Sequence, residues 1–550
     1  MATIEKRVSV DLTSCEREPI HILGGVQPFG YLIAYTPDGL IARISANAAD
    51  LFGRPAEEMI GVPVADHIGE ALYDTLRTRA GRLTGDDSVE RLFGQQLGGH
   101  KALVDIAMHW STGLVVIELE PHARGATTDH ATDVKRMVAQ LSDAGDLDVL
   151  MDRAARQMKA LTGFDRVMIY RLSDGGEGHG EVVAEAAEDG LEPFLGLNYP
   201  ASDIPAQARR LYLRSQLRII ADIDAAAVSI LPEQGADGAR LDLSLSSLRS
   251  VSPIHIEYLR NMGVRASMSV SIIRDGKLWG LFACHHYSGP RILTYDVRTA
   301  AELFGQLFAL ILAEKESAAM RALDDQARVL HDRLMSQLAG GARLDENFEA
   351  IAETLRSIIP CDGVSAHIDG GHQSVGIAPD RAASQGLTTF LNTAAASRVY
   401  ASDHLAGVYE GAATLPMAGI LTIPVSRNPR DYIVCHRKAV PQTVTWAGNP
   451  EKAVESGPNG DRLMPRSSFA AWTEEMRDRS QPWTDQEVRA AEWLRVTLLE
   501  VVLKMTDKAA TEAVRAAERQ ELLIAELNHR VRNILTLIRG VIVQSRGDTD

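Results

Sequence analysis

The segment from Pro200 to Tyr212 combines a carboxylate with a predicted helix start. Asp203 lies two residues before Pro205, whose fixed φ suits the first position of a helix, and a run of Ala, Leu and Arg follows. A carboxylate is stabilised at the N-terminus of a helix because the helix dipole is positive there. On the local sequence alone we therefore expect Asp203 to cap this helix.

Two further groups of residues carry reactive side chains. Cys15 lies two positions before Arg17 in a polar segment, and a neighbouring cation favours the thiolate form of a cysteine. Cys284, His285 and His286 are possible metal ligands. However, neighbouring residues on a strand point to opposite faces, and no second group of Cys and His completes a tetrahedral set. We therefore do not expect a metal site there.

His529 lies on a long predicted helix, and Asn533 follows one turn later on the same face. An exposed neutral imidazole is a competent nucleophile toward a γ-phosphate. Arg530 and Arg532 could attract that phosphate. On the local sequence alone, however, a single histidine on a helix is usually structural or solvent-facing.

Composition narrows the class of protein. The chain has 550 residues, of which 45% are apolar and 24% charged, and its net charge is −16. This charge argues against nucleic acid or an anionic membrane as a partner. Four cysteines make no disulfide framework, no apolar run reaches 18 residues, and the first seven residues are too polar for a signal peptide. We expect a cytoplasmic protein with no membrane span.

The hydrophobic patterns alternate between strands and helices, which predicts an α+β multidomain fold. A hairpin with Asp275-Gly276 at its turn is the sharpest local signal. Thr484 and Glu487 form a capping box at the start of the last helix. The predicted strands are 31–35, 40–44, 114–119, 166–171, 268–273, 278–283, 419–424 and 431–435, and the predicted helices are 148–161, 295–338 and the stretch after Thr484.

Four motif groups, in this order, make the chain resemble the bacterial phytochromes. They are the leader around Cys15, the segment Pro200–Tyr212, the pair Cys284-His285, and a polar insertion from Trp446 to Glu474. The resemblance implies a leader and PAS domain at 1–125, a bilin-binding GAF domain at 135–315, and a PHY domain at 325–505 whose tongue spans about 445–482. It also implies part of a dimerisation and histidine phosphotransfer helix at 506–550, in the manner of HWE-type histidine kinases.

By this resemblance, the cofactor is biliverdin IXα, attached through a thioether to Cys15. Relatives that use other bilins place their cysteine beside the pair matching Cys284-His285, so Cys284 remains an alternative. Arg218 and Arg249 match the residues that hold the two propionates, and His255 and His285 match those near the pyrrole nitrogens and the D-ring carbonyl. The remaining implied pocket residues are Tyr170, Tyr199, Asp203, Ile204, Pro205, Tyr212, Tyr258, Ser267 and Ser269.

The resemblance also implies a switch. Light rotates the D-ring, the tongue refolds from a hairpin to a helix, and Ser468 replaces Arg466 as the partner of Asp203. Trp472 belongs to the same tongue. A light-insensitive PAS-GAF sensor of haem or another small ligand is the alternative function.

The output implied is control of histidine kinase activity, with His529 as phosphoacceptor and a response regulator as partner. The sequence contains no Gly-rich nucleotide-binding region after His529, so we expect no autokinase activity from this chain alone. Leu494, Leu498, Val501 and Met505 follow heptad spacing, which predicts a coiled coil and a parallel homodimer. An ordinary amphipathic helix buried in its own domain has the same spacing.

Overall fold

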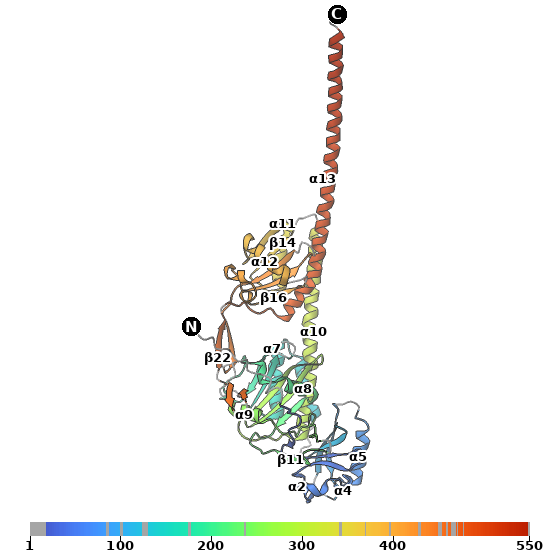
Figure 1. The fold of residues 1–550 in the computed structure, drawn as a ribbon, viewed down its shortest axis with the longest axis vertical. Helices are drawn as coiled ribbons and strands as arrows, with labels where there is room; N and C mark the ends of the chain where they lie inside the picture. The colour runs from blue at the N-terminus through green and yellow to red at the C-terminus, as the bar shows by residue number, and fades with distance from the viewer. Residues whose placement is uncertain are drawn as a thin grey trace. The chain divides into compact units, whose positions relative to one another are not determined.

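The computed structural model describes most of the chain in two compact units. The units are 1–317 with 444–474, and 318–443 with 475–550. The residues described are 18–83, 87–99, 103–123, 130–173, 176, 178–235, 238–339, 344–368, 370–394, 398–426, 431–448, 454–457, 460–463, 469, 471–476 and 478–547. Each unit is considered by itself (Figure 1).

The first unit begins with a seven-stranded sheet in the order β1-β11-β3-β2-β6-β5-β4. One of its strands, β11, comes from a much later part of the chain and pairs antiparallel with both β3 and β1. Helices α2–α5 contribute to the apolar core on one face. The elements are β1 Gly25–Val26, β2 Tyr31–Tyr35, β3 Ile41–Ser45, α2 Ala48–Phe52, α3 Ala56–Met59, α4 Ala65–Ile68, α5 Glu70–Ala80, β4 Val89–Gln96, β5 Leu103–Ser111, β6 Leu114–Pro121 and β11 Val228–Leu231.

The second sheet of this unit has eight strands in the order β10-β12-β13-β7-β8-β9-β19-β22. Strands β12 and β13 form the predicted hairpin, and Asp275 and Gly276 at its turn have φ of 50° and 73°. The last two strands come from the predicted tongue. The elements are α6 His130–Ser142, α7 Leu147–Thr162, β7 Arg166–Leu172, β8 Gly180–Ala187, β9 Asn198–Tyr199, α8 Ala206–Arg214, β10 Leu217–Ile220, α9 Pro253–Asn261, β12 Ala266–Arg274, β13 Lys277–His286, β19 Gln442–Ala447 and β22 Ala471–Met476. Between β19 and β22, strands β20 Val454–Gly457 and β21 Gly460–Leu463 pair with each other in a separate two-stranded sheet.

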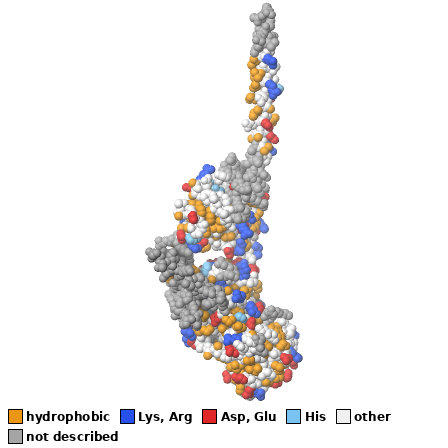
Figure 2. Space-filling model, in the orientation of Figure 1, with side chains coloured by type: hydrophobic (Ala, Val, Ile, Leu, Met, Phe, Trp, Pro, Cys, Tyr) orange, Lys and Arg blue, Asp and Glu red, His pale blue; other side chains and the backbone are white. Residues whose placement is uncertain are grey.

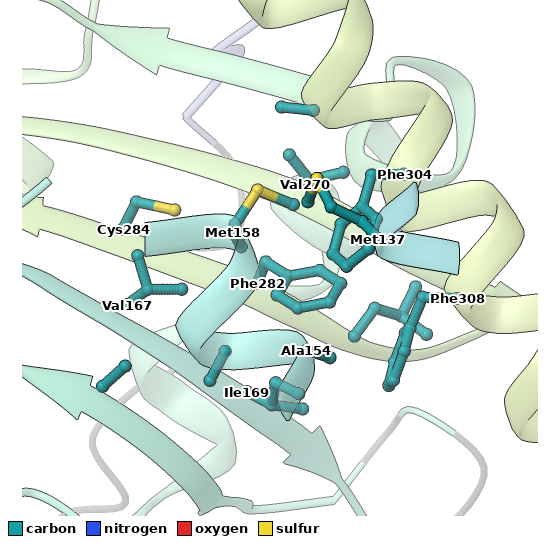
Figure 3. Packing of buried hydrophobic residues seen from close by; sticks show 14 of the residues in the cluster. Met137, Ala154, Met158, Val167, Ile169, Val270, Phe282, Cys284, Phe304 and Phe308 are labelled. Atoms are coloured by element: carbon teal, nitrogen blue, oxygen red, sulfur yellow. The ribbon is translucent and has the colours of Figure 1, made fainter. Parts of the chain in front are cut away.

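One face of this second sheet packs against α6, α7 and the start of α10 (Tyr295–Ala339). Phe282 from β13 lies between Phe304 and Phe308 of α10, with ring centroids 6.0 and 5.1 Å away (Figure 3). Not every leucine of this helix faces the sheet. The side chains of Leu303 and Leu310 are 41% and 67% exposed, whereas Leu312 is buried in the same core as the phenylalanines.

The second unit contains a five-stranded sheet in the order β15-β14-β18-β17-β16. Helix α11 and the first part of α13 contribute to the apolar core on one face, and α12 to the core on the other. The elements are α11 Leu344–Ile358, β14 Gly363–Ile368, β15 Gly371–Gly376, α12 Arg381–Ala394, β16 Tyr400–Ser402, β17 Gly419–Pro424, β18 Tyr432–Arg437 and α13 Asp485–Gly547.

Helix α13 begins at the predicted capping box. The backbone N–H of Thr484 donates to Oε2 of Glu487 over 2.8 Å, and the N–H of Glu487 donates to Oγ1 of Thr484 over 3.2 Å. The helix then continues well past the sheet (Figure 1). None of the helices described is long and apolar enough to cross a membrane.

The first two residues of the predicted coiled-coil seam, Leu494 and Leu498, are buried inside their own domain. Leu494 and Leu498 are 0% and 1% exposed and pack in the core of their own domain, so they are not available to a second chain. The side chains of Val501 and Met505 lie outside those described. Apolar side chains do become exposed further along α13, and they appear as orange groups on its distal part (Figure 2).

Truncation of Leu494 tests this core assignment. We expect Leu494→Ala to lower the free energy of unfolding by about 2–5 kcal/mol, because it leaves a cavity in a packed core. Val496→Ala is the control, since Val496 lies on the same turn and is 63% exposed. Urea denaturation of both variants measures the difference. Equal small effects would place Leu494 outside the core.

Candidate functional site

Two adjoining cavities lie in the first unit, with volumes of about 160 and about 110 Å³. Both are lined by Asp203, Ile204, Arg218, His255 and Tyr258. The first also reaches the leader, at Glu18 and Ile20. The second also reaches the sheet. Every residue predicted to contact a cofactor lines one cavity or both, except Cys15, which lies outside the described residues.

The segment Pro200–Tyr212 forms the wall shared by the two cavities. Residues Ala201–Asp203 make a single 3₁₀ turn, and α8 starts at Ala206. Ile204 has an extended conformation because it precedes Pro205, so the turn and the helix stay separate. Asp203 is therefore not the cap of α8, as the local sequence suggested. Its Oδ2 instead accepts a hydrogen bond of 3.3 Å from the hydroxyl of Tyr258.

Arg209 holds this turn in place, and sequence reasoning assigned it no role. Its Nε donates to the carbonyl of Ile204 over 2.7 Å, and its Nη2 donates to the carbonyls of Ala201 and Gly178 over 3.0 Å each. The side chain is only 9% exposed. The one signal in the sequence was an arginine inside the helical part of the motif, where solvent-facing arginines are common.

Two guanidinium groups face the first cavity. Arg218 on β10 donates to the backbone carbonyls of Arg249 and Ser250 over 2.7 and 3.0 Å, and Arg249 donates to the carbonyl of Ile20 over 3.4 Å. In the part of the chain that the structure describes, neither forms an ion pair with a carboxylate, and Nε of Arg249 is buried without a partner. Burial, with nearby Arg249, lowers the pKa of Arg218 to about 9.

Helix α9 supplies the next pair of side chains. Ser252 caps the helix by accepting from the N–H of Ile254, and Pro253 occupies its first turn. Ser252 also donates to Oε2 of Glu18 over 2.7 Å, which ties the leader to the helix start. His255 and Tyr258, three residues apart on one face, stack with ring planes 11° apart.

Strand alternation decides which side chains of the sheet face the second cavity. His285 on β13 pairs with Ser267 on β12 and with Arg166 on β7, so these three side chains share one face. Ser269 and Tyr170 lie on the same face. Burial lowers the pKa of His285 to about 3, and Arg166 contributes to this shift. Burial likewise lowers the pKa of His255 to about 4.

Cys284 lies on the opposite face. It packs in the apolar core with Met158, Val167 and Phe282 (Figure 3), and burial raises the pKa of its thiol well above the usual range. It is therefore directed away from both cavities, which removes it as an alternative attachment point. The described residues also contain no cluster of three or more His, Cys, Asp or Glu side chains suited to a metal.

Aromatic rings surround the second cavity. Tyr170 and Tyr199 meet edge to face with centroids 5.7 Å apart. The backbone approaches the Tyr170 ring so closely that a Cβ on Gly180 would come 1.9 Å from the ring, so only glycine fits there. Phe469 of the tongue meets Tyr258 edge to face at 5.1 Å.

The tongue extends the sheet of this domain. Trp446 on β19 pairs in parallel with Asn198 on β9, and Asn198 donates to the carbonyl of Thr445 over 3.3 Å. Trp472 on β22 is 39% exposed. Arg466 and Ser468, the predicted switch residues, lie outside the described residues.

His529 is exposed on α13, with no domain packed around it in the described chain. The side-chain amide of Asn533 lies 3.4 Å from its Nδ1, so the two share a face as the spacing predicted. Arg530 pairs with Glu526 over 2.9 Å.

Comparison with known proteins covers nearly the whole chain. Family models match in the order of the motifs: a PAS fold at 15–122, a GAF domain at 146–312 and a phytochrome region at 327–507. A bacteriophytochrome of Pseudomonas aeruginosa is 35% identical over 96% of this chain and 71% of its own length. The chain belongs to the bacteriophytochrome family. It is thus a phytochrome photosensory core, from a family of red/far-red photoreceptors.

Other phytochromes match the chain over a similar length. Cyanobacterial phytochrome B of Nostoc is 34% identical over 91% of this chain and 67% of its own length. The crystal structure of a bacteriophytochrome from R. palustris has a TM-score of 0.80 and 34% identity, and it covers 90% of this chain and 99% of its own. The photosensory core module of a Stigmatella aurantiaca phytochrome has a TM-score of 0.78 and 37% identity, with the same coverage. Bacteriophytochrome homologues imply a bilin chromophore.

The residues present fit a bilin. A linear tetrapyrrole carries two carboxylates, and the first cavity presents two guanidinium groups that form no ion pair with any carboxylate of the described residues. The second cavity offers neutral imidazoles and aromatic walls to the rest of an extended, mostly apolar molecule. Nδ1 of His285 is buried without a hydrogen-bond partner in the described structure, which suits a polar group of a ligand.

The lowered pKa of His285 predicts a pH effect on the stability of the chain without pigment. In the unfolded state His285 is protonated below about pH 6.5, whereas in the folded state it stays neutral down to about pH 3. The free energy of unfolding therefore decreases as the pH falls from 6.5 to 3. His285→Asn should make the drop in unfolding free energy between pH 6.5 and 5 smaller by about 1.6 kcal/mol.

Urea denaturation at the two pH values measures this drop. His255, His367 and His436, whose pKa values are also lowered by burial, are present in both proteins and cancel in the comparison. An identical drop in the variant and the wild type would mean that His285 titrates normally in the folded chain.

Proposed function

We propose that this chain is a red/far-red photoreceptor that binds biliverdin IXα covalently through Cys15 and controls a histidine kinase output. The observation that carries the proposal is a pair of adjoining cavities. One end has two guanidinium groups with no carboxylate ion pair in the described part of the chain, and the other has neutral histidines with tyrosines. The bilin supplies the light absorption and the photoisomerisation. The chain supplies its binding, its orientation and the response.

Each part of the pocket has a physical task in this proposal. Arg218 and Arg249 neutralise the propionates, because a carboxylate leaves water readily only when a fixed cation meets it. Tyr212, Ser267 and Ser269 add hydroxyl groups. His255 and the main-chain carbonyl of Asp203 accept N–H groups of the pyrroles, and His285 meets the carbonyl of the D-ring.

Asp203 links the pocket to the tongue. Its bond to Tyr258, which itself contacts Phe469 of the tongue, supports this role. In the proposal, Arg466 is the partner of Asp203 in one light state and Ser468 in the other. The β-strands of the tongue then exchange for a helix, which makes the tongue a bistable element biased by a local contact.

The output travels along α13 to His529 in a parallel homodimer. Ile524, Leu527, Val531, Ile534 and Ile538 follow one another at steps of three and four, and each is at least 44% exposed. Ile524, Val531 and Ile538 share one heptad position and Leu527 lies at the other, a combination that favours two parallel strands, whereas Ile534 at this second position does not follow it. His529 lies outside this seam, which leaves it open to a kinase domain and a response regulator in the cytoplasm.

Absorption spectra with biliverdin test the function directly. We expect a covalent adduct with a red or far-red band that interconverts reversibly on illumination. Cys15→Ala should still bind the pigment but release it on denaturation, whereas Cys284→Ala should retain it, because Cys284 lies in the core. A haem Soret band with no bilin band would favour the haem-sensor alternative, and covalent pigment in Cys15→Ala would contradict the attachment.

Arg249 tests the recognition of the propionates. Arg249→Gln removes a charge-assisted hydrogen bond, so we expect biliverdin to bind about 10- to 100-fold more weakly. Arg260→Gln is the control, because Arg260 is exposed on α9 and pairs with Asp224 at 2.9 Å. Fluorescence titration of the two variants in a Cys15→Ala background gives the dissociation constants. Equal constants would exclude a propionate contact at Arg249.

A further inference from the structure

Two cysteines of the second unit lie on adjoining segments. Cys361 occupies the short connection between α11 and β14, and Cys435 lies on β18, which pairs with β14 at Val364. The backbone N–H of Asp362, the residue after Cys361, donates to the carbonyl of His436, the residue after Cys435, over 2.8 Å, and both cysteine side chains pack in one apolar core. The two positions are 74 residues apart in the sequence (435 − 361).

The environments of the two thiols differ. Cys361 is half-buried, and its backbone carbonyl accepts from Nε of Arg356 over 3.2 Å. The hydrogen bond from Cys435 lowers the pKa of Cys361, and the charges of Arg356 and Arg437 lower it further. Cys435 is 0% exposed, and its pKa is raised by the same hydrogen bond and by burial. A reachable, activated thiol thus lies beside a buried one.

We propose that Cys361 and Cys435 form a redox-responsive dithiol, which closes to an intramolecular disulfide when the chain meets a low-molecular-weight disulfide such as oxidised glutathione. Neither the bilin site nor the phosphoacceptor helix uses these residues. Oxidation of the two thiols therefore does not require that the chain act as a photoreceptor.

The reaction balances in two exchange steps. The thiolate of Cys361 attacks one sulfur of the oxidant, whose S–S bond breaks, and one glutathione thiolate leaves. Cys435 then loses its proton, attacks the sulfur of Cys361, and expels the second glutathione. Two protein thiols are oxidised and one glutathione disulfide is reduced to two thiols. Cys361 is the attacking group because thiolate character and access control this chemistry.

The sulfurs need to approach to about 2.05 Å for the bond to form. Cys361 lies outside regular secondary structure, so its side chain and its loop are the parts that would have to move. Cys435 is fixed in the sheet.

The bond would form next to the base of the long helix. Arg437, two residues after Cys435, donates to the carbonyls of Pro360 and Pro482 over 2.7 and 2.8 Å and pairs with Glu487 in the first turn of α13. Cys435 also shares a core with Leu494. A disulfide here cross-links the α11–β14 connection to β18, the strand that carries Arg437, and so stiffens the point from which α13 leaves the domain.

Treatment of the full chain with oxidised glutathione tests the proposal. A Cys15→Ser background avoids an adduct at the leader cysteine and leaves three of the four thiols. We expect free thiols to fall from three to one, with an intact mass lower by two hydrogens and a cross-linked peptide joining 361 to 435. The unfolding temperature of this domain should rise by about 5–10 °C and return on reduction.

Two variants identify the order of attack. Cys435→Ala should stop at a glutathione adduct on Cys361, and Cys361→Ser should leave Cys435 unmodified. Cys284→Ala, in the core of the other unit, should behave like the background protein. Circular dichroism before oxidation confirms that each variant is folded. An unresolved glutathione adduct on Cys361 when Cys435 is present, or no reaction at all, would overturn the proposal.

Discussion

The pocket depends on two positive charges inside the protein that, among the described residues, form no ion pair with a carboxylate and feel only the more distant charges of Glu118 and Asp242. Arg218 and Arg249 repel one another, and backbone carbonyls, which carry only partial charge, offset part of this cost. An anionic ligand would offset the repulsion that remains. The site therefore favours a dianion over a neutral ligand on electrostatic grounds, before any shape is considered.

A buried carboxylate, Glu118, keeps the segment around these arginines in position. It lies on β6 of the first sheet, is 1% exposed, and accepts from the backbone N–H groups of Ser247 and Leu248 over 3.0 and 2.8 Å. The carbonyl of Ser247 in turn accepts from Arg218. The first sheet thus helps to build a cavity that it does not line, and the two sheets of this unit act as one support.

Local sequence rules predicted the elements whose geometry is itself local. The hairpin at Asp275-Gly276 and the capping box at Thr484 needed only a few neighbouring residues. Alternation along β13 likewise separated Cys284 from His285. Such rules do not reveal distant partners: the residue before Pro205 already separates Asp203 from α8, but the hydrogen-bond partner of Asp203, Tyr258, lies on another helix 55 residues away. Arg209 was missed for the same reason, because its carbonyl partners at Gly176 and Gly178 lie far upstream.

The incorrect assignment of Leu494 and Leu498 to a dimer seam on α13 has a different cause. Steps of three and four describe any helix with one apolar stripe, whether it packs on a sheet or on a second chain. Leu494 and Leu498 fit both arrangements equally, and only the neighbouring sheet distinguishes them. The sequence likewise contained Cys361 and Cys435, but nothing in their spacing revealed that β14 and β18 are neighbours.

Strand β11 has a consequence for synthesis on the ribosome. Strand β11, residues 228–231, pairs with β3, which ends at Ser45, so the edge of β3 emerges 183 residues before its partner does (228 − 45). An uncovered edge can pair with other chains. A nascent chain must therefore protect that edge until β11 arrives, and any fragment cut between the two domains would carry it permanently bare.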